Sequence, residues 1–132
     1  DKALEIYKRI DNPNEIMHST IIKGFVNLST KQSMDKALEI YKSLESPDHI
    51  THNTIIKGLV NLRSQEAMDK ALEIYENLER PNSITHNTII KGLVNLSTQD
   101  AMNKALEIYE SLDDPSVIIH NTMINGLVNL RS

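Results

Sequence analysis

Polar side chains recur four residues apart in four segments of the chain, and their chemistry is that of binding. Asparagine offers hydrogen-bond donors and acceptors together, and lysine offers a mobile positive charge. Residues four apart share one face of a helix, so each set would form a polar line suited to an extended polymer. A solvated helix face copied by duplication explains the same pattern. The four sets are Ser19, Lys23 and Asn27; Asn53, Lys57 and Asn61; Asn87, Lys91 and Asn95; and Asn121, Asn125 and Asn129.

Histidines recur in the same segments, and the alternatives for them are a metal ladder or a packed side chain. They are His18, His52, His86 and His120, with His49 outside the series. Packed helices lie about 8 to 10 Å apart, so one histidine per segment cannot gather several ligands around one ion. Serine, histidine and aspartate recur only at this regular spacing and form no unique nucleophile–base pair. We therefore expect a packed or groove-lining histidine, no metal, no cofactor and no enzyme activity.

An internal repeat indicates the elements that carry these residues. The segment Asp-Lys-Ala-Leu-Glu-Ile-Tyr begins at residues 1, 35 and 69 and returns at Asn103, a 34-residue period typical of helical solenoids. One helical pattern, called helix A, runs as ITHNTIIKGLVNL from Ile50, and a second, called helix B, runs as AMDKALEIYENL from Ala67. The period predicts an all-α, right-handed α-solenoid superhelix of helix-turn-helix repeats with eight helices.

The array is expected to fill residues 1–132 as a single domain. Its predicted parts are helix B at 1–11, A–B hairpins at about 15–46, 49–80 and 83–113, and helix A at 117–130. Prolines at 13, 47, 81 and 115 follow each helix B and are expected to stop it. The Ser/Thr/Gln stretches around Ser29, Ser64 and Thr98 have side chains that can cap the start of helix B. An array that starts with B and ends with A exposes faces buried elsewhere, which predicts head-to-tail stacking between copies.

Composition and charge narrow the function. Hydrophobic residues make up 39% and aromatic residues 4%, so the core should be aliphatic. The chain has no cysteine, no apolar run of membrane-spanning length and no targeting segment, so we expect a soluble protein of unknown compartment. The net charge is −4, but helix A carries lysines and no acids while the acids gather in helix B and the turns. One face is therefore mildly positive and permits a polyanion partner.

Two further residue types recur with the repeat and point to packing. Glycines lie in the middle of helix A, where glycine costs about 1 kcal/mol relative to alanine, so a neighbouring helix should approach closely there. Tyrosines lie on the apolar stripe of helix B and are expected in the core. The glycines are Gly24, Gly58, Gly92 and Gly126, and the tyrosines are Tyr7, Tyr41, Tyr75 and Tyr109.

Helix A also carries a family resemblance that spans every repeat. ITHNTIIKGL resembles the opening of a pentatricopeptide repeat, T-Y-N-x-L-I-x-G-L, and KALEIY is similar to that family's second helix. Pro47-Asp48 and Pro81-Asn82 stand where the family ends its unit. The related tetratricopeptide repeat shares the length but places glycine, alanine and aromatic residues differently. The chain departs from the family in having His52 for tyrosine, no glycine between the helices and a shorter turn after helix B.

The resemblance implies single-stranded RNA binding, about one base per repeat, read by a helix A residue and the residue closing the same repeat. The implied pairs are Ser19 with Asp48, Asn53 with Asn82, and Asn87 with Ser116, while Asn121 has no partner. The residues implied to sandwich bases are Ile50, Ile84 and Ile118, with Ile16 as a further candidate, and those at the backbone are Lys23, Lys57 and Lys91. Asn-led pairs in the family favour pyrimidines, which implies a pyrimidine-rich ligand.

Two other functional interpretations remain open. Helical solenoids present concave surfaces to proteins, so a peptide- or protein-binding scaffold of the tetratricopeptide kind fits the same groove. Near-identical repeats also fit a designed or excised array without a ligand. Binding of single-stranded RNA that falls with salt separates the first interpretation from these two.

Overall fold

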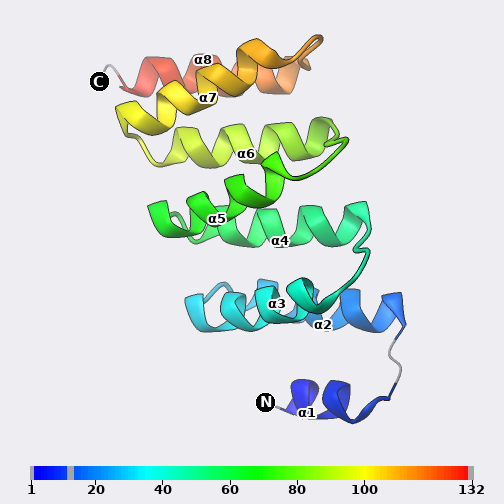
Figure 1. The fold of residues 1–132 in the computed structure, drawn as a ribbon. Helices are drawn as coiled ribbons and strands as arrows, with labels where there is room; N and C mark the ends of the chain where they lie inside the picture. The colour runs from blue at the N-terminus through cyan, green and yellow to red at the C-terminus, as the bar shows by residue number, and fades with distance from the viewer. Residues whose placement is uncertain (1, 12–13, 131–132) are drawn as a thin grey trace. The chain divides into compact units, whose positions relative to one another are not determined.

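The computed structural model describes residues 2–11 and 14–130, and within these ranges the chain is all-helical and without strands (Figure 1). The helices are α1 (Lys2–Arg9), α2 (Glu15–Asn27), α3 (Lys31–Ser43), α4 (His49–Asn61), α5 (Gln65–Glu76), α6 (Ser83–Asn95), α7 (Gln99–Ser111) and α8 (Val117–Leu130). The prediction of an all-α fold with eight helices is confirmed for this part of the chain. None of the described helices combines the length and apolar character needed to cross a bilayer.

The chain divides into two compact units, residues 1–58 and 59–132. In the first unit α2 packs against both α1 and α3. In the second unit α6 packs against α5 on one side and against α7 and α8 on the other, and α7 also contacts α8. The A helix α6 therefore touches the B helix before it, the B helix after it and the next A helix.

Aliphatic side chains fill the interior of each unit, as the composition predicts. The largest fully buried side chains of the first unit are Ile22, Met34, Ile55 and Ile56, and those of the second unit are Leu59, Met68, Ile89, Ile90, Leu93 and Ile119. Alanines of helix B, such as Ala37 and Ala105, are fully buried and let the A helices approach. Phe25 is the single phenylalanine of the sequence and is 3% exposed.

The helices α3, α5 and α7 each begin at a hydroxyl side chain. The N-cap residues are Thr30, Ser64 and Thr98, whose hydroxyl oxygens accept the backbone amides of Ser33, Ala67 and Ala101 at 3.1 Å. The cap of α3 is thus Thr30, which lies in the predicted stretch around Ser29. Such caps satisfy amides that have no partner within the helix. Ser33 adds a capping box, because its hydroxyl also accepts the Thr30 amide at 3.2 Å.

The residues just before these caps adopt a left-handed backbone. Ser29, Arg63 and Ser97 have φ angles of 55°, 54° and 56°. This region favours glycine, since a Cβ atom crowds the following carbonyl oxygen there. Because the chain has no glycine between the two helices of a repeat, a residue with a side chain adopts the glycine conformation at each of these turns.

The B helices end earlier than the prolines alone indicate. The chain leaves helical geometry at Leu44 (ψ 133°) and Leu112 (ψ 131°), three residues before Pro47 and Pro115. In the last turns of α3 and α7 the Ser43 and Ser111 hydroxyls donate to the carbonyls of Ile40 and Ile108 at 2.6 Å. Helix α5 also ends well before its proline, at Glu76, although Asn77 stands where the other two helices have serine. The expected stop at Pro13 lies outside the described residues.

Candidate nucleic-acid interface

The predicted polar lines lie at the surface of the A helices. Lys23, Lys57 and Lys91 are exposed. The asparagines one turn further along are exposed as well, namely Asn27, Asn61 and Asn95. Because these positions are four residues apart, each helix presents an ammonium group and an amide on one face. The chemistry available there is attraction for an anion beside hydrogen bonding to a polar edge.

Isoleucines in the first turn of the A helices are strongly exposed. The exposed fractions are 75% for Ile16, 70% for Ile50, 66% for Ile84 and 65% for Ile118. Leaving an aliphatic side chain of this size in water forgoes about 1.5–3 kcal/mol of burial. The backbone carbonyls of these isoleucines accept hydrogen bonds from the hydroxyls of Thr20, Thr54, Thr88 and Thr122 at 2.7–2.9 Å. Each isoleucine therefore stands at a regular turn of helix with its side chain available for contact.

Two of the predicted helix A reading residues also touch a neighbouring helix. The Ser19 hydroxyl lies 3.3 Å from the Thr51 hydroxyl within the first unit. The Asn87 Oδ1 accepts the Thr122 hydroxyl at 3.2 Å within the second unit. Both reading residues are half-buried, as is Asn53, whereas Asn121 is exposed. The contact at Asn87 uses the side-chain oxygen Oδ1, so the side-chain nitrogen Nδ2 can still donate.

The predicted closing residues have a structural role that the sequence reasoning missed, because each begins an A helix. Asp48 Oδ1 accepts the Thr51 amide at 2.8 Å, and Asn82 Oδ1 accepts the Thr85 amide at 3.0 Å. Ser116 Oγ accepts the Ile119 amide at 3.3 Å. The amide and hydroxyl bonds from Thr51 lower the pKa of Asp48. An Asp, Asn or Ser three residues before the buried threonine or isoleucine was the available signal.

A small cavity lies beside the first of these caps, within the first unit. Its volume is about 390 Å³, within the range of sites that hold small ligands. The lining residues are His18, Ser43, Leu44, Glu45, Ser46, Pro47, Asp48 and Thr51. The lining thus includes the predicted closing residue Asp48, which directly precedes α4. The exposed Ile50 lies in the first turn of that helix.

Each A-type histidine pairs with the tyrosine of the preceding helix B. The tyrosine hydroxyl and histidine Nδ1 are 2.5–2.8 Å apart in the pairs Tyr7–His18, Tyr41–His52, Tyr75–His86 and Tyr109–His120. Burial lowers the pKa of His52 and His86, and burial raises the pKa of Tyr41 and Tyr75. A neutral imidazole whose Nδ1 accepts a hydrogen bond from a neutral phenol hydroxyl fits both shifts. Among the described residues no three histidine or acidic groups come together as metal ligands do.

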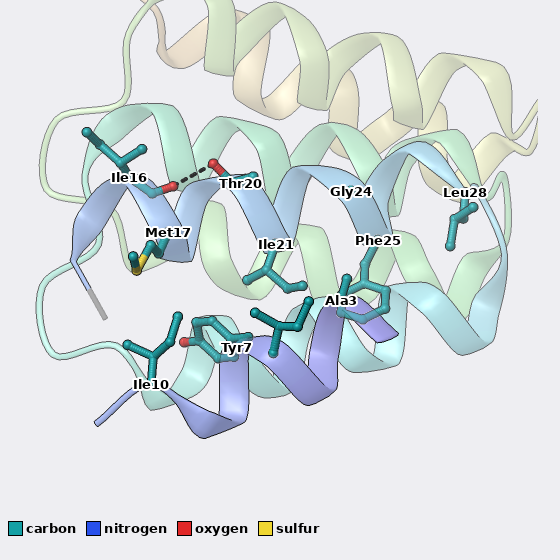
Figure 2. A pocket seen from close by; sticks show the side chains of 11 residues that line it. Ala3, Tyr7, Ile10, Ile16, Met17, Thr20, Ile21, Gly24, Phe25 and Leu28 are labelled. Carbon is teal, nitrogen blue, oxygen red and sulfur yellow. Dashed lines mark hydrogen bonds between the residues drawn. The ribbon is translucent and has the colours of Figure 1, made fainter. Parts of the chain in front are cut away.

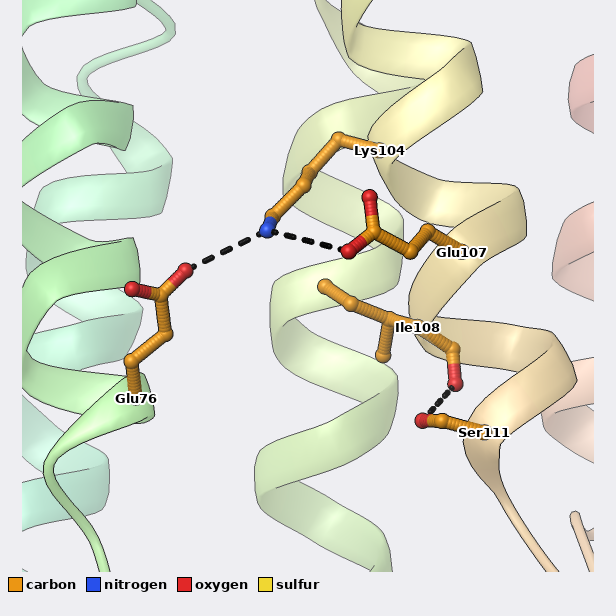
Figure 3. Close-up of polar contacts among 5 residues, drawn as sticks. All are labelled: Glu76, Lys104, Glu107, Ile108 and Ser111. Atoms are coloured by element: carbon orange, nitrogen blue, oxygen red, sulfur yellow. Dashed lines mark hydrogen bonds and ion pairs between the residues drawn. The ribbon is translucent and has the colours of Figure 1, made fainter.

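Charged side chains of the B helices engage one another across the surface of the second unit. The Lys104 ammonium of α7 lies 3.3 Å from a Glu76 carboxylate oxygen of α5 and 3.8 Å from Glu107, as Figure 3 shows. Such exposed pairs contribute about 0–1 kcal/mol. Their relevance here is location: the B helices carry both acids and lysines, whereas α2, α4 and α6 each carry one exposed lysine and, among these three, only α2 carries an acid, Glu15.

No protein-family model and no curated protein matches the chain. The geometry of the A helices and the sequence resemblance to pentatricopeptide repeats are therefore the grounds on which a function can be proposed.

Proposed function

We propose that the chain is a solenoid of pentatricopeptide-like hairpins that binds single-stranded RNA along its A helices. The observation that carries the proposal is the pairing of a strongly exposed isoleucine with an exposed lysine on one helix, Ile50 with Lys57 in α4 and Ile84 with Lys91 in α6. An aliphatic side chain can cover the face of a base, and a lysine can neutralise the adjacent phosphate. The chain acts on this view as a binding protein and not as an enzyme.

Recurring internal contacts support the solenoid part of the proposal. The four tyrosine–histidine pairs have the same sequence separation and the same edge-on geometry, with ring centroids 5.6–5.7 Å apart. Equivalent residues thus make equivalent contacts in successive 34-residue units, which is what a stack of like hairpins requires.

The asparagines supply the base-reading chemistry. An asparagine side chain donates and accepts at once, so it can pair with the edge of an unstacked base. Asn53 and Asn87 lie one turn after Ile50 and Ile84, on the same face of their helices. Asn82 keeps an amide nitrogen in addition to the oxygen that caps α6, and it is exposed. We therefore assign sequence preference to the asparagines and affinity to the isoleucines and lysines.

Fluorescence anisotropy of short labelled RNAs tests the proposal. We expect saturable binding to a pyrimidine-rich single strand that weakens with salt, and weaker binding to a purine-rich one. In the double variant Lys57→Glu with Lys91→Glu, the slope of log affinity against log salt should fall by about 0.7 for each phosphate that the protein no longer neutralises.

The matched control reverses two exposed lysines on B helices, Lys8→Glu with Lys42→Glu. This double variant has the same net charge as the first and should bind RNA better than it does. Equal loss of affinity in both variants would mean that only net charge matters and would refute an A-helix site. If no RNA binds at low salt, the isoleucine faces would be assigned to a peptide or protein partner instead.

A further inference from the structure

An apolar groove runs between α1 and α2 in the first unit (Figure 2). Its volume is about 560 Å³. The lining residues are Ala3, Ile6, Tyr7, Ile10, Ile16, Met17, Thr20, Ile21, Gly24, Phe25 and Leu28. Ile6 and Leu28 are each 60% exposed, whereas Ile40 and Ile108, at the position of Ile6 in α3 and α7, are 6% and 7% exposed. An apolar surface that is covered elsewhere in the chain is open at this groove.

Gly24 forms an empty notch in this groove, and the other three glycines show what fills such a notch. A Cβ atom placed on Gly24 would meet nothing within 4 Å. On Gly92 it would lie 2.8 Å from both methyl carbons of Val60, and on Gly126 it would lie 2.7 Å from a methyl carbon of Val94. Each filled notch therefore holds the valine of the preceding A helix.

The chain contains one more valine of this series, on α8. Val128 follows Val26, Val60 and Val94 at the same 34-residue interval, and its side chain is 59% exposed. Ile124 on the same helix is 57% exposed, although its equivalents Ile56 and Ile90 are fully buried. The molecule thus carries an open notch on α2 and an exposed valine face on α8 that have the same residues as a pair already in contact.

We propose that α8 of one copy docks in the α1–α2 groove of a second copy, with Val128 seated in the notch at Gly24. The docked α8 contacts α1 and α2 of the second copy in the way that α6 contacts α7 and α8 within the second unit. The identity of the surfaces argues for a second copy as occupant, because α1 and α7 share the segment KALEIY and α8 keeps the Gly-Leu-Val-Asn of α6.

Different faces meet in this contact, so it is heterologous. Each docked copy still offers its own groove or its own α8 to a further copy, and association continues beyond a dimer unless a ring closes. The proposal therefore expects a series of species whose mean size grows with protein concentration.

Sedimentation velocity over a wide range of concentration tests the docking. We expect the sedimentation coefficient of the unaltered chain to rise with concentration. Gly24→Val fills the notch and Val128→Glu places a charge on the docking face, so both should hold the coefficient at the monomer value. Gln99→Glu adds the same charge at the exposed start of α7, outside the groove lining and outside α8, and should leave association unchanged. Circular dichroism at low concentration checks that each variant is folded.

Disulfide trapping tests the residue contact directly, since the sequence has no cysteine. A chain carrying Gly24→Cys is mixed with one carrying Val128→Cys under mild oxidation. The close approach of the internal glycine–valine pairs predicts that the mixture forms a covalent dimer faster than either variant alone. A chain that stays monomeric at all concentrations, or a mixture that couples no faster than the separate variants, would overturn the proposal.

Discussion

Helices α6 and α8 have closely similar sequences and very different surroundings. In α6, Ile90 is fully buried and Leu93 is 1% exposed, because α5, α7 and α8 surround the helix. In α8 the equivalent Ile124 and Leu127 are 57% and 39% exposed. The apolar stripe of an A helix can therefore pack against helices that precede it and helices that follow it. The sequence of the helix alone does not reveal whether both groups of helices are present.

The same contrast holds between the notches at Gly24 and Gly92. Both glycines lie at the same position of an A helix, but only Gly92 receives a valine from the preceding A helix. Identical residues thus carry different free energies in the two places. Substitutions made in matched pairs turn this difference into a measurement.

The largest effect is expected for truncation of the equivalent isoleucines in α6 and α8. Ile90→Ala should lower the free energy of unfolding by about 2–5 kcal/mol, since it leaves a cavity in a closed core. Ile124→Ala should cost less than about 1 kcal/mol at a concentration where the chain is monomeric, because most of that side chain already meets water. Urea denaturation of both variants gives the comparison, and equal costs would contradict it.

Adding one carbon at the two notches should shift stability in opposite directions. Gly92→Ala forces the new Cβ against both methyls of Val60, a stiff β-branched side chain, and overpacking costs about 1–3 kcal/mol. Gly24→Ala meets open space and should stabilise α2 by up to about 1 kcal/mol through helix propensity. Thermal and urea denaturation both report the sign.

A second change at the notch separates overpacking from other causes. Val60→Ala combined with Gly92→Ala removes the crowding methyls, so the double variant should be more stable than the sum of the two single effects predicts. Strict additivity would show that the crowding at Gly92 does not produce the cost.

A smaller effect is expected from pH at the Tyr75–His86 contact of α5 and α6. Burial lowers the pKa of His86 in the folded chain, so the unfolded chain binds a proton first as the pH falls. The stabilisation that the neutral His86 contributes is complete above the ordinary histidine pKa of about 6.5, and it is lost as the pH falls from there through the lower pKa of the folded chain. The urea midpoint should decrease between pH 7.5 and pH 5, and the decrease should be smaller in His86→Gln.

The control for this prediction is His49, which is exposed and stands outside the tyrosine–histidine series. His49→Gln should leave the contribution of His86 unchanged. A pH dependence reduced by His49→Gln and unaffected by His86→Gln would contradict the assignment. The lowered pKa of Asp48 acts in a separate window, below the ordinary value of a carboxyl group.

The smallest effect is expected at the left-handed turns. Ser97→Gly should raise the free energy of unfolding by about 1 kcal/mol or less, because a non-glycine residue at φ 56° is strained and glycine is not, while glycine also adds entropy to the unfolded chain. Ser83→Gly, inside the first turn of α6, should instead lower it by about 0.5–1 kcal/mol. Matched denaturation curves distinguish the two signs.

The sequence predicted the helical content because the apolar spacing and the caps agree with one another. The period of 3.6 in ITHNTIIKGLVNL and the hydroxyl residue before each of α3, α5 and α7 indicate the same elements. The end of helix B was less predictable, since α3, α5 and α7 all end several residues before the proline that follows them. The sequence predicted that a neighbouring helix approaches closely at each glycine of helix A. At Gly24 no side chain fills the notch, because the approach depends on a valine from a neighbouring helix and not on the glycine itself.

The candidate site was predictable in its residue types and less so in its contacts. Exposure of Ile84 and Lys91 follows from their place on helix A. The contact between Asn87 and Thr122 and the pairing of Tyr75 with His86 join residues on different helices, and single-sequence periodicity carries no information about such pairs. Sequence reasoning placed both tyrosine and histidine in packed positions without joining them.

The helix caps at Asp48, Asn82 and Ser116 restrict how this surface can be re-engineered. The oxygen that each side chain gives to a backbone amide begins an A helix, and replacement by alanine at such a position costs about 0.5–2 kcal/mol. A residue chosen there for a new ligand preference must also cap the start of a helix. The residue types that meet this requirement best are aspartate, asparagine, serine and threonine. Substitutions to other residue types, made to alter the ligand preference, would have to be placed at Ser19, Asn53, Asn87 or Asn121.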